Sequence, residues 1–281
     1  MILNAYQMSK DIRDSLNEVT ASHWTDLAIL RKMNKAQAKL AMLLSMSIGD
    51  WLLVSTDLTP VNGLVTLPSN CAKPVYLENK DNGTEIQFSL TVRERQVTRI
   101  TGVDIDQLEP DAYMFGEYLQ INQDNYSSQV TLWYEKNVPD LHFGIGTTGS
   151  TTNALAFQVT NIPVPRDDYY NNVYVSIVGG TGIGTRALIT DYTGSTGLAT
   201  VSGTFSTDSA YGTETVLPEQ AIVPLTQMAT VELLSKPSSA IDPKYFEFAK
   251  LEMRDTLDIF KDWISTRVKN SQRLRPQEDW S

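Results

Sequence analysis

Four carboxylates in the stretch TGVDIDQLEPDAY are the first candidates for chemistry. They are Asp104, Asp106, Glu109 and Asp111. Two carboxylates that lie close together can share acid–base work when their environments differ. This stretch is rich in turn residues and offers no histidine or other partner motif. We therefore expect a solvated acidic loop and not a catalytic pair.

A glycine-rich run from Gly179 to Gly184 follows a predicted strand and has the spacing of a dinucleotide-binding loop. A loop of that kind must lead into a helix. Here the next residues are RALITDY, which are rich in β-branched and aromatic side chains, and Thr193-Gly194 follows. The run therefore predicts the turn of a β-hairpin and not a nucleotide site.

The remaining reactive residues are too few or too isolated to form a site. The chain has one cysteine, Cys71, and two histidines, His23 and His142. One cysteine excludes an internal disulfide framework and a multi-cysteine metal site. We find no serine in a glycine-flanked elbow, no catalytic triad and no glycosidase-like carboxylate pair. The sequence therefore predicts a non-enzymatic protein with no catalytic residue, no cofactor and no bound metal.

The acidic charge is concentrated in the middle of the chain. The net formal charge is −10, with 23 basic and 33 acidic residues, and residues 51–241 hold 9 of the basic and 20 of the acidic ones. Such a surface repels nucleic acid at short range, which argues against a DNA-binding module. A wall past which DNA slides without binding remains compatible with it. The sequence also shows no signal peptide and no stretch long enough to span a membrane.

Helical patterns stand at the two ends of the chain. The first fifty residues predict a small bundle of three helices, over 2–17, 25–33 and from Asn34 onward, with Gln37 completing a capping box at Asn34. A long helix is expected from Pro243 to about Lys269, because this stretch contains no glycine and no further proline. Its apolar residues follow helical spacing.

Between the ends the pattern is that of strands. Residues 51–136 read as short strands with turns, among them a hairpin at Asn82-Gly83. Residues 143–216 are rich in Gly, Thr, Ser, Asn and Tyr and contain the four strand-like stretches ALAFQVT, NVYVSIV, RALITDY and LATVSGTF. We expect an α+β fold: an N-terminal helical bundle and a long C-terminal helix packed with a small β-sheet region, plus an inserted all-β domain of sandwich or barrel type. The predicted domains are 1–141 with 217–269, the insertion 142–216, and an extended tail 270–281.

The C-terminal helix and tail are the candidate binding elements. The helix is either buried on two sides in its own domain, or it packs on its own domain and on a neighbouring subunit. The residues that would make the subunit contact are Phe246, Met253, Phe260, Trp263 and Ile264. The tail has too little apolar surface to fold alone, yet it contains Trp and Arg, the residue types enriched at interface hot spots.

The order of these segments resembles the head-to-tail adaptor (connector) proteins of tailed bacteriophages. The resemblance rests on the helical bundle through GDWL, on LTPVNGLVTLPSNCAKPVYLENKDNGTEI, on YMFGEYLQINQDNYSSQVTLWYEKNVPDL, and on the long helix with its polar tail. It covers roughly 1–141 and 217–281. Residues 142–216 depart from the pattern of the smaller family members.

The resemblance implies a virion structural protein in the neck, between head and tail, that is made in the host cytoplasm. It implies a homo-oligomeric ring of about twelve copies, with the portal protein and a tail or nozzle protein as partners and with DNA passing through unbound. The tail would dock on the portal through Arg273, Leu274, Arg275 and Trp280, and the four carboxylates of the acidic loop would face the DNA channel.

The competing interpretation is a receptor- or carbohydrate-binding β-module protein of the phage tail. It rests on Tyr169, Tyr170, Tyr174 and Tyr192 in the insertion, because aromatic side chains can form platforms for sugars. Tyrosines in strands more often serve packing, so the adaptor remains the preferred interpretation.

Overall fold

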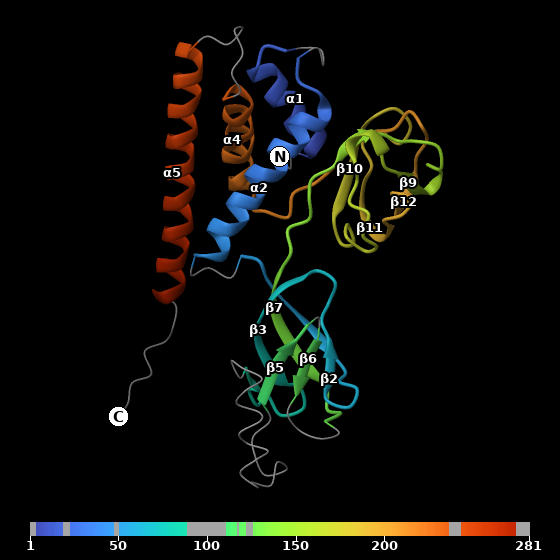
Figure 1. Ribbon diagram of the computed structural model, residues 1–281, viewed down its shortest axis with the longest axis vertical. Coiled ribbons are helices and arrows are strands. Elements are labelled where there is room, and N and C mark those ends of the chain that lie inside the picture. The colour runs from blue at the N-terminus through green and yellow to red at the C-terminus, as the bar shows by residue number, and fades with distance from the viewer. Residues whose placement is uncertain are drawn as a thin grey trace. The chain divides into compact units, whose positions relative to one another are not determined.

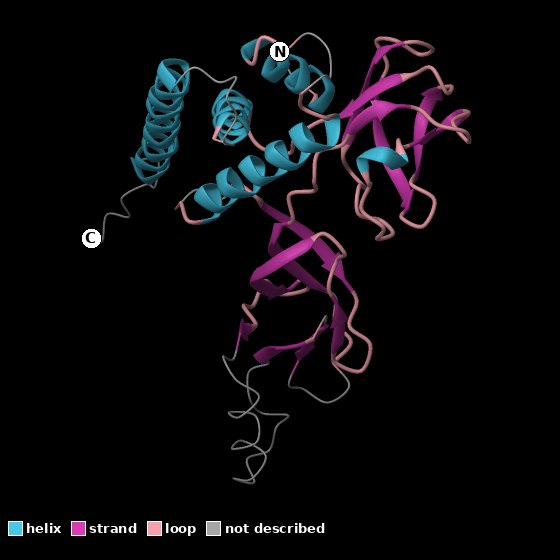
Figure 2. Ribbon diagram, turned by 45° about the horizontal axis from the view of Figure 1, so that its top comes forward, coloured by secondary structure: helices cyan, strands magenta, loops and turns pink. Residues whose placement is uncertain are grey.

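The structure is a computed structural model and describes residues 4–18, 23–47, 51–88, 111–116, 118–121, 126–235 and 243–273, with side chains to Thr266 in the last range. Figure 1 labels the elements and Figure 2 colours them by type. Contacts divide the chain into two compact units. One joins 1–51 to 138–281, and the other is formed by 52–137.

The expected fold class is wrong. The described residues are organised mainly around three β-sheets, with four α-helices, in a mixed α+β arrangement. The first fifty residues do not form a bundle by themselves, because their two helices are completed by a helix from beyond residue 220. The compact units also follow other boundaries than the composition indicated, since residues 142–216 share a unit with the helices.

The helices of the first unit gather around one apolar helix. They are α1 (Ala5–Ser15), α2 (Asp26–Ser45), α4 (Ile222–Leu234) and α5 (Pro243–Arg273). Helix α4 buries Leu225, Met228, Ala229 and Leu233 and contacts α1, α2 and α5. A helix that is apolar on nearly every side must be covered on nearly every side. Helix α4 is therefore the centre of this part of the molecule (Figures 1 and 2).

Helix α2 is continuous where two helices were expected. Its N-cap is Thr25, whose hydroxyl accepts a hydrogen bond from the Ala28 amide, and no break occurs at Asn34. The Asn34 side chain instead bonds both the N–H and the C=O of Leu141, and the Gln37 amide donates to the Pro139 carbonyl. Residues three apart lie on one helix face, so the pair that resembled a capping box holds segment 139–141 against α2.

Six strands of the first unit form a curled antiparallel sheet in the order β8-β13-β10-β11-β12-β9. The turn after β8 reaches the opposite edge, where the Thr147 amide donates to the Ala156 carbonyl. The core of the sheet is rich in tyrosine, and β13 packs against α1 at Gly212, where an added Cβ would lie 2.5 Å from the Tyr6 amide nitrogen. The strands are β8 (Phe143–Ile145), β9 (Thr152–Ala156), β10 (Tyr174–Gly179), β11 (Arg186–Thr193), β12 (Leu198–Thr204) and β13 (Ala210–Thr213).

The glycine-rich run is a hairpin turn, as the sequence predicted. Strands β10 and β11 pair antiparallel on either side of it. Gly180, Gly182 and Gly184 all have positive φ, and a Cβ at Gly180 would lie 2.1 Å from the Asp208 carbonyl oxygen. Only glycine fits such a position without strain.

The second unit consists of two sheets with an apolar core that includes Val65, Leu77, Leu119 and Leu132. One sheet has the order β1-β7-β3 and the other β2-β6-β5-β4, in which β4 and β5 are parallel. Asn82-Gly83 makes the expected turn, with Gly83 at φ +68°. The strands are β1 (Leu53–Leu58), β2 (Leu64–Thr66), β3 (Cys71–Asn79), β4 (Gln87–Phe88), β5 (Asp111–Phe115), β6 (Tyr118–Ile121) and β7 (Val130–Lys136).

Candidate functional site

Helix α5 has two apolar faces, and the described part of the chain covers one of them. Phe260 and Ile264 are buried, and Trp263 stacks on Phe260 and on Trp51, with ring centroids 5.8 Å and 4.5 Å apart. Phe246 and Met253, on the same face, are half-buried. The five side chains proposed for a subunit contact therefore lie on the face of α5 that packs inside its own unit.

The outward face of α5 carries a second group of apolar side chains. Phe248 is 63% exposed, Leu251 56% and Ile259 69%. Their spacing places them on one side of the helix, opposite the covered face. The sequence predicted apolar residues at helical spacing on this helix, but which side chains face outward could be decided only from the packing on α4.

Most of the other predicted contact residues fall outside the described part. Asp104, Asp106 and Glu109 lie outside the described residues, and so do Leu274, Arg275 and Trp280. Asp111 begins β5 and is half-buried, so it belongs to a strand and not to a loop. Helix α5 continues to Arg273, so the first residues assigned to the extended tail are helical. The side chain of Arg273 is not described.

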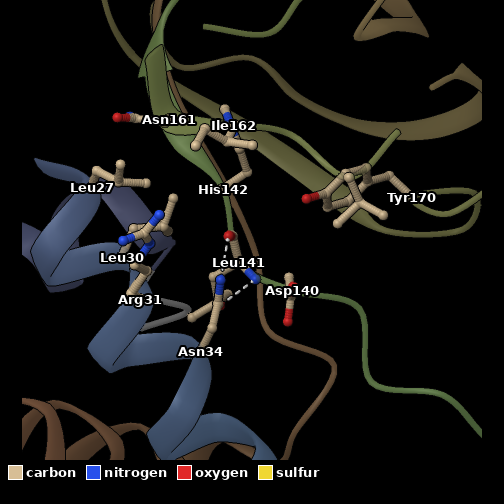
Figure 3. A pocket seen from close by; sticks show the side chains of 11 residues that line it. Leu27, Leu30, Arg31, Asn34, Asp140, Leu141, His142, Asn161, Ile162 and Tyr170 are labelled. Carbon is tan, nitrogen blue, oxygen red and sulfur yellow. Dashed lines mark hydrogen bonds between the residues drawn. The ribbon is translucent and has the colours of Figure 1, made fainter. Parts of the chain in front are cut away.

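A cavity of about 160 Å³ lies in the first unit between α2 and the segment that leads into the curled sheet. Its walls include Leu27, Leu30, Asp140, Ile162 and Tyr170. Figure 3 shows this cavity with the two hydrogen bonds between Asn34 and Leu141. Burial raises the pKa of Asp140 above its ordinary value.

His142 also lines the cavity and is almost completely buried. Its ring lies nearly parallel to those of Phe157 and Tyr211, at centroid distances of 4.8 Å and 5.8 Å, and these two rings also stack on each other at 5.0 Å. The Tyr211 hydroxyl accepts the Gln158 amide proton at 2.7 Å and forms a hydrogen bond with His142 Nδ1, 3.0 Å away. The other ring nitrogen, Nε2, has no partner among the described residues.

The chemistry available at this cavity is limited. Burial lowers the pKa of His142 to about 3, so the imidazole cannot take up a proton near neutral pH. The arrangement is that of a packing histidine in an aromatic core.

The tyrosines proposed as a sugar platform do not form one. Tyr170 and Tyr192 are buried and contact each other edge-to-face at 4.8 Å. The hydroxyl of Tyr169 accepts a hydrogen bond from the Asp140 amide. Tyr174 is partly exposed, but the Arg186 guanidinium lies 3.7 Å from its ring centroid. An aromatic platform needs free ring faces, so these four residues favour packing over glycan binding.

The thiol of Cys71 is a poor nucleophile in this structure. Burial raises the pKa of the Cys71 thiol to about 11, so its nucleophilic thiolate is scarce near neutral pH.

Across the described ranges, no group of three or more His, Cys, Asp or Glu side chains is placed to hold a metal ion. None of the helices within those ranges is both long enough and apolar enough to cross a membrane.

An ion cluster between α2 and α4 escaped the sequence analysis. Lys32, Lys35 and Lys39 on α2 all contact the Glu232 carboxylate on α4, at 3.2, 3.0 and 2.6 Å. Burial alone would raise the pKa of Glu232, but the three ammonium groups outweigh it and lower the pKa to about 2. Three basic residues spaced three and four apart signal one helix face. The acid that they share lies about 200 residues away in sequence.

Glu232→Gln is expected to lower the free energy of unfolding by about 1–2 kcal/mol at neutral pH, because three ammonium groups lose their carboxylate while remaining partly solvated. The pKa is depressed, so the contribution is complete above about pH 4.5 and is lost as the pH falls towards 2. Denaturant titrations at several pH values would measure both effects. Glu252→Gln, at an exposed position of α5, is the matched control and should change little.

No family model matches this sequence, and no match was found among the curated proteins.

Proposed function

We propose that this chain is a virion structural protein, a head-to-tail adaptor that forms a ring between the portal and the tail of a tailed bacteriophage. The observation that carries the proposal is the second apolar face of α5. Phe248, Leu251 and Ile259 are exposed in a helix whose opposite face is already occupied by α4. Large apolar side chains grouped on one exposed face are typical of an interaction surface.

The chemistry of the chain supports assembly over catalysis. Cys71 and His142 are both held in their unreactive forms by burial. The net acidity between residues 51 and 241 suits the wall of a conduit, because like charges keep DNA from adhering. The proposed partners are the portal protein, a tail or nozzle protein and further copies of the same chain, in a ring of about twelve copies.

Portal docking is the experiment that tests this function. A chain truncated after Arg273 lacks residues 274–281, including Leu274, Arg275 and Trp280. We expect its circular dichroism to match that of the full chain, because α5 is kept whole, and we expect its binding to purified portal to weaken at least about tenfold, since Trp and Arg dominate most interfaces. Surface plasmon resonance would measure the difference.

The control for the truncation is a full-length chain in which Leu274, Arg275 and Trp280 are each replaced by alanine. It should bind as weakly as the truncated chain if these side chains anchor the tail. Equal portal binding by the full, truncated and substituted chains would contradict the docking role of the tail. A full-length chain that shows no affinity for the portal would contradict the adaptor function itself.

A further inference from the structure

The exposed face of α5 combines apolar and acidic side chains in one stripe. Phe248, Leu251 and Ile259 share it with Glu252, Asp255 and Asp262, which are also exposed. At 100° per residue, all six project within about 60° of Phe248. The aromatic and leucine side chains lie toward the beginning of the helix, while Asp255 and Asp262 lie toward its end. We call these six residues the α5 face.

Helix α2 presents a stripe of complementary character. Lys35, Lys39, Met42 and Met46 follow one another at spacings of four, three and four residues, so they project on one side of the helix. Met42 is 65% and Met46 78% exposed, and the two lysine side chains are about half exposed. The bases lie toward the beginning of this stripe and the methionines at its end. We call these four residues the α2 face.

The lysines of the α2 face retain charge for a second partner. Glu232 supplies one carboxylate to three ammonium groups, so the cluster keeps an excess of positive charge. Each ammonium group has three donors, and Lys35 and Lys39 remain open to solvent. The α5 face carries an excess of negative charge, because no ion pair is found for Glu252, Asp255 or Asp262 among the described side chains.

The order of residues along the two faces fixes the direction in which they match. In an antiparallel pair, Asp255 and Asp262 lie opposite Lys35 and Lys39, and Phe248 and Leu251 lie opposite Met42 and Met46. The two groups are centred roughly 10 Å apart along α2 and roughly 14 Å apart along α5, at about 1.5 Å per residue. Flexible lysine and methionine side chains span that difference, and methionine sulfur packs well against aromatic rings.

We propose that the α2 face of one copy docks antiparallel on the α5 face of a second copy. This inference rests on the proposed function and names the surfaces through which the ring would form. The two faces are different surfaces of the same chain, so the contact is heterologous. Repeating a heterologous contact builds a ring when the rotation closes. Each copy in a closed ring gains two such contacts, which offsets the modest area of one helix pair.

The test uses two full-length variants, each with one face blocked. Phe248→Glu with Leu251→Glu blocks the α5 face, and Met42→Glu with Met46→Glu blocks the α2 face. All four side chains are exposed, so both variants should keep the melting temperature of the wild type. Mass photometry and sedimentation velocity would follow the wild type, each variant, and an equal mixture of the two variants.

The expected result is a wild type that forms multimers, two variants that remain monomeric, and a mixture that forms a complex of two copies and nothing larger. Only one pair of intact faces exists in the mixture, which is why growth must stop at two. Added salt should weaken the complex, because the charge pairs at the edge of the contact are solvated.

Three outcomes would overturn the proposal in different ways. Multimers that persist in both variants, or a mixture that remains monomeric beside a multimeric wild type, would rule out these faces and leave the adaptor ring intact. A wild type that binds the portal but never self-associates, in solution or on the portal, would rule out any such contact. A wild type that neither binds the portal nor self-associates would remove the proposed function as well.

Discussion

Replacing Arg13 by methionine is expected to lower the free energy of unfolding by roughly 3–5 kcal/mol, because it removes the buried guanidinium that pairs with the buried Glu18 carboxylate. Arg13 is 4% exposed and donates to Glu18 at 3.3 Å, to the Trp24 carbonyl at 3.0 Å and to Asp26 at 2.6 Å. Glu18 is buried too, and it accepts hydrogen bonds from the backbone amides of His23 and Trp24. These bonds join the end of α1 to the start of α2.

The design includes a control and a rescue. Arg254→Met removes an exposed guanidinium from α5 and should change stability by less than about 0.5 kcal/mol. In the double variant Arg13→Met with Glu18→Gln, the buried charge is gone while an amide oxygen still accepts from the backbone, so part of the stability should return. Denaturant titration followed by circular dichroism would measure all three. A double variant less stable than Arg13→Met alone would contradict this account.

Local signals in the sequence predicted local structure well. The Asn82-Gly83 turn and the hairpin at the glycine-rich run are both present, because each depends on residues that tolerate positive φ wherever they occur. The strand pattern in SQVTLWYEK likewise corresponds to β7. These features depend on neighbours in sequence, so no knowledge of the tertiary structure was needed.

Features that depend on partners far away in the sequence were predicted wrongly or were not predicted. Asn34 and Gln37 match a capping box, but their partners are Leu141 and Pro139, about 100 residues away. The boundary of the second unit at 52–137 is set by β1 pairing with β7, segments about 75 residues apart. The amino-acid composition changes near residue 142, but the boundary between the two units lies between residues 137 and 138. Sequence spacing alone could not show this pairing.

The candidate contact surface on α5 could likewise be predicted only in part from the sequence. Helical spacing predicted an apolar stripe on α5 and further apolar residues beside it, since periodicity is a property of the helix itself. It could not decide which side faces α4, and the residues assigned to a subunit contact lie on the covered side. The spacing of the α2 lysines places them on one helix face, a signal that was not recognised from the sequence. Their excess of positive charge became evident only from the structure, in which the three lysines share the single carboxylate of Glu232.

Acid is expected to destabilise the wild type through His142 well before the carboxylates begin to titrate. Burial lowers the pKa of this histidine to about 3, whereas an ordinary histidine titrates near 6.5. Between these values the unfolded chain binds a proton that the folded chain does not, so stability falls as the pH drops below about 6.5. At about 1.4 kcal/mol per pH unit, the loss from His142 between about pH 7.5 and pH 5 amounts to roughly 2 kcal/mol.

The variant that isolates this effect is His142→Phe. Phenylalanine keeps an aromatic ring against Phe157 and removes the buried Nε2, which has no partner among the described residues. It also removes the hydrogen bond to Tyr211, whose hydroxyl still accepts from the Gln158 amide, so the fold should persist. Unfolding free energies measured by denaturant titration at the two pH values should differ by roughly 2 kcal/mol less in this variant than in the wild type. His23→Gln replaces the other, exposed histidine and is the matched control for a histidine substitution. If the wild type and His142→Phe lose the same stability over this range, then His142 is protonated in the folded protein and the neutral, Tyr211-bonded ring described above is incorrect.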